Sequence, residues 1–330
     1  MDLPLLSAGF VGLALTLYVM LDGFDLGVGI LLLAQPNRAF RDHMIDSKTP
    51  TWDGNETWLV MTGITLFTAF PIAYGILLPA FYLPVVVMLL SLGIRGVSFE
   101  FRVQMKKYQY RWDFAFGLAS LVAAFMQGLV LGGLFQGITV RNLQFSGSVF
   151  DIFRPLALLS GAGLVFGYAV LGAGWLYLKA IDDIAAFAMT SIRIAVPSFL
   201  VITGAGCICA AMIQPGIRLA WALHPIALSV IAILVIFLGL SLSVLPRPER
   251  TSTLFILGLA IFLLGMAGFA IIVFPAIIPF ELSLWEAASS PSSQVFLLIG
   301  ALLVTPVILA YSAFAYWVFR GKTPQGGWTE

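Results

Sequence analysis

Four acidic residues lie within, or at the start of, long apolar segments of the chain. Asp22 and Asp25 interrupt a long apolar segment, and Asp53 and Glu56 stand at the head of the next one. A charged side chain in the middle of a membrane costs about 2.5–3.5 kcal/mol on insertion scales. Chains retain such groups where a partner, a cavity or a proton path requires them, so these carboxylates are the first candidates for chemistry.

Asp22 and Asp25 are three residues apart, so on a helix they share one face. Eight residues follow Asp25 before the expected end of the helix, about 12 Å along its axis, which places the pair in the inner half of that helix. Three glycines in the same run make the helix narrow and permit close approach by a neighbour. Two interpretations stay open: proton transfer, or pairing with basic groups that only fixes packing.

Asp53 and Glu56 have the spacing of an N-terminal capping box ahead of an apolar run, and capping alone would explain both. The alternative depends on location, because the third apolar segment brings Arg95, and then Glu100 and Arg102, to the same membrane boundary. Carboxylates that are close together and partly desolvated suit proton relay. Arg95 is then either their counter-charge or an arginine that extends to the interface.

The composition excludes a soluble globular domain, since 60% of residues are hydrophobic and only 10% are charged. The net charge of +1 gives no reason to expect nucleic-acid binding. Spans of about 20 apolar residues predict an all-α polytopic membrane protein with about nine transmembrane helices in a single membrane domain, 1–330. Their approximate cores are 5–33, 56–74, 77–97, 114–135, 156–178, 194–213, 219–244, 254–278 and 295–319.

Basic residues predict the orientation, because they favour the cytoplasmic side of short loops. The loops on one side, together with the C-terminus, hold 13 of the 17 Lys and Arg residues, including Arg247 and Arg250. We therefore expect a periplasmic N-terminus and a cytoplasmic C-terminus.

A short motif that occurs twice in the chain indicates a parallel repeat. Leu-Gly-Val-Gly at 26–29 in the first expected helix matches Leu-Gly-Ala-Gly at 171–174 in the fifth. The hypothesis is two four-helix units, helices 1–4 at about 5–135 and helices 5–8 at about 156–278, plus one extra helix. Val170 stands where the first copy has Asp25, so only the first unit would carry the charges.

Histidine is scarce, with only His43 and His224 in the chain. Haem iron in membrane proteins is usually held by buried His or Met ligands, and no metal-ligand spacing occurs here. We expect this chain to bind no cofactor of its own and any redox centre to belong to another subunit. Gln127 is expected to hydrogen-bond between helices. Five aromatic residues near the expected interfaces are interpreted as membrane anchors: Trp52, Trp58, Trp112, Trp317 and Tyr316.

Several motifs, in the same order along nearly the whole chain, resemble subunit II of cytochrome bd-type quinol oxidases. They are Asp-Gly-Phe-Asp-Leu-Gly-Val-Gly at 22–29, Trp-Asp-Gly-Asn-Glu-Thr-Trp at 52–58, Ser-Leu-Gly-Ile-Arg-Gly-Val-Ser-Phe-Glu-Phe-Arg at 91–102, Leu-Phe-Gln-Gly at 134–137, Trp-Glu-Ala-Ala-Ser-Ser at 285–290 and the stretch 311–317. The first two together are highly specific. The short connection between the sixth and seventh helices is similar to that of the compact, cyanide-insensitive branch.

The resemblance implies a partner, subunit I, that carries two b-type haems, haem d and the quinol-binding loop. It implies an enzyme of the bacterial inner membrane that oxidises quinol, reduces oxygen to water and draws the protons from the cytoplasm. A small single-helix subunit, and a structural quinone or lipid, are further expectations. Asp25 and Asp53 match positions of the proton-uptake path; Asp22 and Arg95 would support it. Glu56 stands where the family varies between Glu and Gln.

Two other functions compete with this hypothesis. A proton-coupled secondary transporter also carries intramembrane carboxylates and repeats, although its polar sites more often lie at mid-membrane on interrupted helices. A purely structural subunit would use its carboxylates for packing alone.

Overall fold

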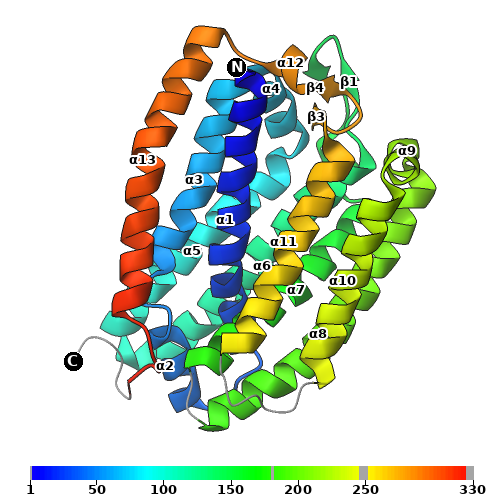
Figure 1. Cartoon of the computed structure of the whole chain (residues 1–330). Coiled ribbons are helices and arrows are strands. Elements are labelled where there is room, and N and C mark those ends of the chain that lie inside the picture. The colour runs from blue at the N-terminus through cyan, green and yellow to red at the C-terminus, as the bar shows by residue number, and fades with distance from the viewer. Residues whose placement is uncertain (1, 180–181, 245–251, 325–330) are drawn as a thin grey trace.

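The computed structural model describes residues 2–179, 182–244 and 252–324, which form one elongated bundle of helices (Figure 1). The helices are α1 (Leu3–Leu32), α2 (Arg38–Asp46), α3 (Trp52–Ala69), α4 (Pro71–Ala80), α5 (Tyr82–Gln104), α6 (Gln109–Gln136), α7 (Pro155–Lys179), α8 (Asp182–Ile213), α9 (Pro215–Leu223), α10 (Pro225–Val244), α11 (Ser252–Val273), α12 (Leu284–Ala287) and α13 (Pro291–Val318). Two 3₁₀ turns, η1 (Lys106–Tyr108) and η2 (Val149–Ile152), lie in the connections.

Local sequence signals set where the outer helices begin. The Asp2 side chain accepts a hydrogen bond from the backbone N–H of Leu5 at 3.1 Å, with proline in the first turn of α1. Ser290 caps α13 in the same way, ahead of Pro291. Both starts follow from unpaired N–H groups that a short polar side chain satisfies and from a proline that needs no donor there.

Eight helices of the described residues are long and apolar enough to cross a membrane, which confirms the all-α polytopic fold class. α3, which lies beside α1 (Figure 1), has 18 residues, about 27 Å in length, but is not one of these eight, so a ninth crossing stays a prediction. The expected second span, 56–74, is wrong at its end: the helix stops at Ala69, since a residue before proline, here Phe70, disfavours helical geometry. The chain then stays helical through Tyr74 and Gly75, the expected link, and α5 begins after Phe81.

Two later predicted spans are also wrong in their bounds, and in each a proline interrupts the helix. The expected helix 219–244 is divided into α9 and α10 at His224, directly before Pro225. The expected helix 254–278 ends at Val273, and residues 276–278 instead form a short strand. The hydropathy of these segments correctly indicated that they are apolar. It did not indicate where a proline ends the helix.

Two small antiparallel hairpins cover one end of the bundle, beside α4 and α12 (Figure 1). Strand β1 (Val140–Arg141) pairs with β2 (Gln144–Phe145), and β3 (Ala276–Ile278) pairs with β4 (Leu282–Ser283). α1 begins at this end and α13 finishes at the opposite end, where α2 lies. That the α2 end faces the cytoplasm stays a prediction; Arg247 and Arg250, which support it, lie outside the described residues.

α1 and α7 pack against each other in the interior of the bundle. The two similar glycine motifs, at 26–29 and 171–174, meet at this contact. A Cβ atom on Gly27 would lie 1.8 Å from the carbonyl oxygen of Tyr168, and one on Gly172 would lie 2.3 Å from the carbonyl carbon of Gly27. No side chain fits at either position, so the two backbones pack directly on one another. The contact agrees with the repeat hypothesis without testing it.

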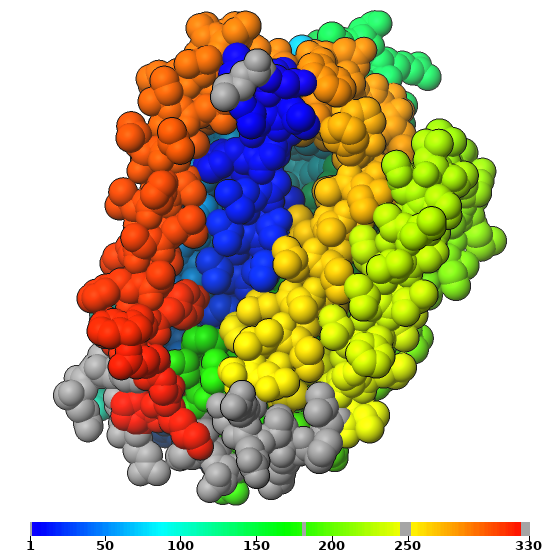
Figure 2. Space-filling view, in the orientation of Figure 1, coloured from blue at the N-terminus to red at the C-terminus, as the bar shows by residue number. Residues whose placement is uncertain are grey.

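α1 changes its surroundings along its length. In its first half Leu5, Leu6 and Leu13 are exposed, and the helix is visible between α13 and α11 (Figure 2). Every residue from Asp22 to Gly29 is buried. The carboxylates therefore belong to the half of the helix that other helices enclose.

Candidate functional site

Asp22 belongs to a buried three-residue ionic group. The Arg95 guanidinium of α5 contacts Asp22 through Nη1, 2.7 Å from Oδ1, and Glu56 of α3 through Nη2, 2.8 Å from Oε2. Asp22 and Arg95 are almost fully buried, and the side chain of Glu56 is 26% exposed. Three helices therefore meet on one arginine, and removing it would leave two carboxylates without their cation.

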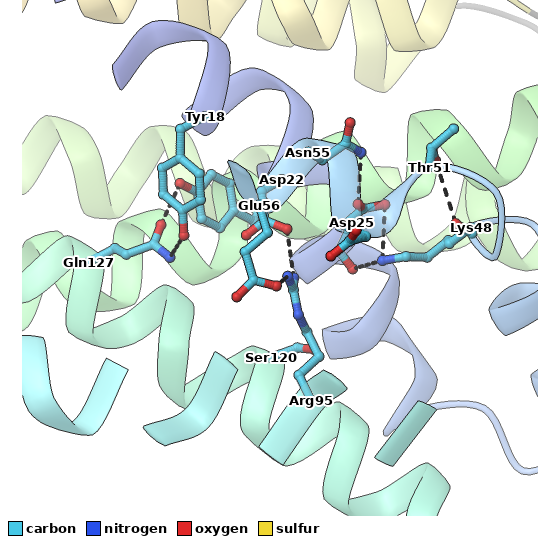
Figure 3. A network of polar contacts seen from close by, with 12 residues as sticks. Tyr18, Asp22, Asp25, Lys48, Thr51, Asn55, Glu56, Arg95, Ser120 and Gln127 are labelled. Atoms are coloured by element: carbon cyan, nitrogen blue, oxygen red, sulfur yellow. Dashed lines mark hydrogen bonds and ion pairs between the residues drawn. The ribbon is translucent and has the colours of Figure 1, made fainter. Parts of the chain in front are cut away.

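Asp25 has a separate cation. The ammonium nitrogen of Lys48 lies 3.0 Å from Asp25 Oδ1, and the other carboxylate oxygen accepts a hydrogen bond from Asn55 Nδ2 at 2.8 Å. Lys48 stands in the turn between α2 and α3, outside the spanning helices, and its side chain extends back into the bundle (Figure 3). Both carboxylate oxygens of Asp25 are thus occupied, from two different elements.

A groove of about 390 Å³ opens beside the first turn of α3. Residues 49–51 and the last turns of α13 line it, as do Asp53, Asn55 and Tyr316. The Tyr316 hydroxyl donates to Asn55 Oδ1 at 2.8 Å, and Asn55 donates onward to Asp25. Because Asn55 is part of the groove wall, a single hydrogen bond joins the groove to the buried carboxylate.

A second hydrogen-bonded chain lies on the other side of Asp22 (Figure 3). The Tyr168 hydroxyl donates to Gln127 Oε1 at 2.8 Å, and Gln127 Nε2 donates to the Tyr18 hydroxyl at 2.7 Å. These residues come from α7, α6 and α1. Gln127 thus makes the expected bonds between helices, and the polar cluster extends one helical turn beyond Asp22.

Arg102 joins a different cluster. It contacts Asp113 at 2.6 Å and also Asp42, which ties α5, α6 and α2 together. Glu100 is exposed. The expected convergence therefore holds for Arg95 but not for Arg102 or Glu100, because these residues lie one to two helical turns further along α5.

The structure brings four of the five predicted site residues together: Asp22, Asp25, Glu56 and Arg95. Asp53 is exposed on the wall of the groove instead. The capping-box alternative is wrong, since Thr51 is the N-cap of α3 and no side chain caps it, while Glu56 pairs with Arg95. Arg95 is a counter-charge rather than an arginine that reaches the interface, because it is 1% exposed.

Two of the aromatic interpretations are also wrong. Trp58 is completely buried in a cluster with Ala14 and Tyr18, and Tyr316 turns inward to Asn55. Trp317 is exposed, as an anchor requires. Sequence position alone did not tell which face of each helix these side chains occupy.

Sequence reasoning missed Lys48 and Asn55. Asn55 lies between Asp53 and Glu56 in the motif at 52–58, and its amide bonds both Asp25 and Tyr316. Lys48 is one of the 13 basic residues on the side of the membrane that is expected to be cytoplasmic, and nothing in that pattern indicates a buried partner. The feature that could have identified Lys48 is its position four residues before Trp52, the first residue of α3. At that distance a long side chain can turn toward the interior of the bundle.

The described residues hold no group of three or more His, Cys, Asp and Glu side chains that suits a metal ion. His43 is buried at the α2 end, where burial lowers its pKa and the Lys179 backbone bonds it, and His224 is exposed near the other end. The two histidines could not ligate one haem together.

The fold and the site define an integral membrane helix bundle with a buried ionic network at one end. Residues 3–319 match the family model of cytochrome bd terminal oxidase subunit II, and the chain belongs to that family. As the motifs predicted, it is a subunit of an oxidoreductase complex. The transporter alternative is not favoured.

Named relatives agree with this assignment. The chain is 29% identical to cytochrome bd-I ubiquinol oxidase subunit 2 of Escherichia coli (strain K12), over 94% of this chain and 93% of that one. It is 27% identical to cytochrome bd ubiquinol oxidase subunit 2 of Bacillus subtilis (strain 168), over 96% and 94%. Its fold matches a chain in the structure of bd oxidase from Geobacillus thermodenitrificans, with a TM-score of 0.77, 15% identity and coverage of 97% and 99%.

Proposed function

We propose that this subunit takes up protons at the α2 end and delivers them through Asp25 toward the site of oxygen reduction in a partner subunit. The observation that carries the proposal is the position of a fully buried Asp25 directly behind the groove wall, where Asn55, held by Tyr316, donates a hydrogen bond to its carboxylate. A carboxylate with both oxygens bonded and no contact with solvent is a costly feature for packing alone.

Asp53 fits the mouth of such a path. It is exposed on the groove wall, two residues from Asn55, so it can exchange protons with water. It makes no ion pair with the described residues. Asp53 would collect protons, and Asp25 would receive them.

The charge balance of the buried network supports proton exchange. Asp22, Asp25 and Glu56 provide three carboxyl groups, and Lys48 and Arg95 provide two cations. With every group ionised the network carries one excess negative charge. One proton on any of the three carboxyl groups would neutralise this excess, and a single proton that can be replaced is what a relay needs.

The remaining parts of the reaction are assigned to the complex. We propose that subunit I holds two b-type haems and haem d, that quinol is oxidised at the outer face, and that the complex lies in the bacterial inner membrane with the α2 end in the cytoplasm. A small single-helix subunit and a structural quinone or lipid complete the proposal. The single membrane domain and the parallel repeat of helices stay predictions as well.

The test is Asp25→Asn in the assembled complex, which keeps the size of the side chain and removes the titrating proton. Oxygen consumption with quinol should fall by about 10²-fold or more, the lower range for loss of a proton-transfer group, while the haem spectrum stays intact. Asp25→Glu should restore part of the activity. Normal turnover of Asp25→Asn would exclude the proton path.

The purely structural alternative makes a different prediction for the same variant. If the carboxylates only hold helices together, Asp25→Asn should lose the haem spectrum and the activity in parallel, because the complex would not assemble. Comparing activity per haem with total haem separates the two functions.

A further inference from the structure

Lys48 reaches the buried network from a turn outside the spanning helices. Residues 47–51 connect α2 to α3, and the Lys48 side chain is 1% exposed. Its ammonium contacts Asp25 twice, at 2.5 Å from the backbone carbonyl oxygen and at 3.0 Å from Oδ1. The third side of the ammonium faces the ring of Phe116 from α6, with 5.5 Å to the ring centroid.

The other charged groups that act on Lys48 come from two helices. Asp22 accompanies Asp25 on α1, and Arg95 extends from α5. Glu56 of α3 lies beyond Arg95, and Tyr316 of α13 lies beyond Asn55. Lys48 is therefore the cation of Asp25, and Arg95 is the cation of the neighbouring pair.

Lys48 also lies next to the groove. The three residues that follow it, Thr49, Pro50 and Thr51, all line the groove, whereas Lys48 itself does not. To take a proton from the groove, the Lys48 nitrogen must leave Asp25 and turn toward these residues. The four-carbon side chain is long and flexible enough for such a change.

We propose that Lys48 is a proton-relay residue, which passes the proton on Nζ to Oδ1 of Asp25 and regains one from the groove. In the first step an N–H bond breaks and an O–H bond forms, so the ammonium becomes an amine and the carboxylate becomes a carboxylic acid. The charge of the pair is zero before and after. In the second step the amine takes a proton from a protonated water in the groove, and that water is left neutral. This inference rests on the proposed function.

The pKa of Lys48 agrees with this role. Burial lowers it from the ordinary value for lysine to about 8, despite the opposing effect of Asp25. Below pH 8 the nitrogen carries a proton that it can donate; above pH 8 it is increasingly a neutral amine with no proton to give. If transfer through Lys48 limits the rate, turnover should fall as the pH rises through about 8.

The experiment compares Lys48→Arg with the unmodified complex between pH 6.5 and 9.5. Arginine keeps the positive charge near Asp25 but does not release its proton in proteins. We expect a normal haem spectrum, a loss of turnover of at least about ten-fold at pH 7, and no fall in the remaining activity around pH 8. Lys106→Arg is the matched control, because Lys106 is exposed, and it should behave as the unmodified complex does.

Wild-type turnover of Lys48→Arg with the same fall near pH 8 would overturn the inference. If that variant does not assemble, the unmodified complex decides: a fall with a midpoint near pH 8 supports the relay, and a flat profile to pH 9.5 overturns it. Asp25→Asn is measured in parallel. Loss of activity in Asp25→Asn with normal Lys48→Arg rejects only the lysine relay, whereas normal Asp25→Asn rejects the proposed proton path itself.

Discussion

α1 and α7 carry the same glycine pattern and pack on each other through it, yet they differ in what lies beside the glycines. α1 has Asp22 and Asp25, each with its own cation. α7 has Val170 at the position that matches Asp25, buried in an apolar cluster. The comparison shows that close backbone packing and buried charge are separate properties. The glycines build the contact, and the charges need additional partners from α3, α5 and the α2–α3 turn.

The largest loss of stability is expected for the ionic group that surrounds Asp22 of α1. Arg95→Met should destabilise the complex by about 3–5 kcal/mol, because it leaves Asp22 and Glu56 buried or half-buried without a cation. Thermal unfolding of the purified complex, followed by the haem spectrum, measures the loss. Arg141→Met is the control, since Arg141 is exposed on β1. Equal melting temperatures for both variants would contradict the account.

The shared glycine contact should come next. Gly27→Ala places a methyl group 1.8 Å from the Tyr168 carbonyl oxygen, so α1 and α7 must move apart. We expect a loss of about 3 kcal/mol, at the upper end for an overpacked core, and a lower yield of assembled complex. Gly12→Ala on the same helix meets nothing within 4 Å and should be neutral or stabilising. The same yield from both variants would argue against direct backbone packing.

Val170→Asp places a carboxylate on α7 at the position that matches Asp25 of α1. The new carboxylate would be buried in an apolar cluster, and we expect a cost of about 2.5–3.5 kcal/mol. Val170→Thr, which is similar in shape, should cost less. The melting temperatures of these two variants decide. If Val170→Asp were as stable as the native complex, the surroundings of α7 would already contain the partners for a charge, and the contrast between α1 and α7 would fail.

Asp53→Asn should have the smallest effect. Asp53 is exposed on the groove wall, where water can replace it as a proton source. Turnover should fall by less than about ten-fold, below the usual range for an internal proton-transfer group, with normal stability. The ratio of the Asp53→Asn and Asp25→Asn rates measures this difference. A loss for Asp53→Asn equal to that for Asp25→Asn would assign Asp53 to the interior of the path.

Much of this arrangement could be predicted from the sequence. Apolar length gave the helical membrane fold, and charge in apolar segments gave Asp22, Asp25 and Arg95, because both signals depend on one segment at a time. Breaks at Phe70 and His224 were missed, since hydropathy averages over the proline that follows each. Lys48 was missed because its partner is 23 residues earlier in the chain. The capping alternative for Glu56 was wrong because an arginine from α5, which the local pattern does not contain, binds it instead.

The central claim is that protons for oxygen reduction enter through the groove and Asp25. The most direct measurement follows proton uptake from solution with a pH-sensitive dye while the fully reduced complex reacts with oxygen. The account predicts that Asp25→Asn slows this uptake by about 10²-fold, together with the electron transfer that depends on it, while oxygen binding is unchanged. Uptake by Asp25→Asn at the native rate would contradict the account.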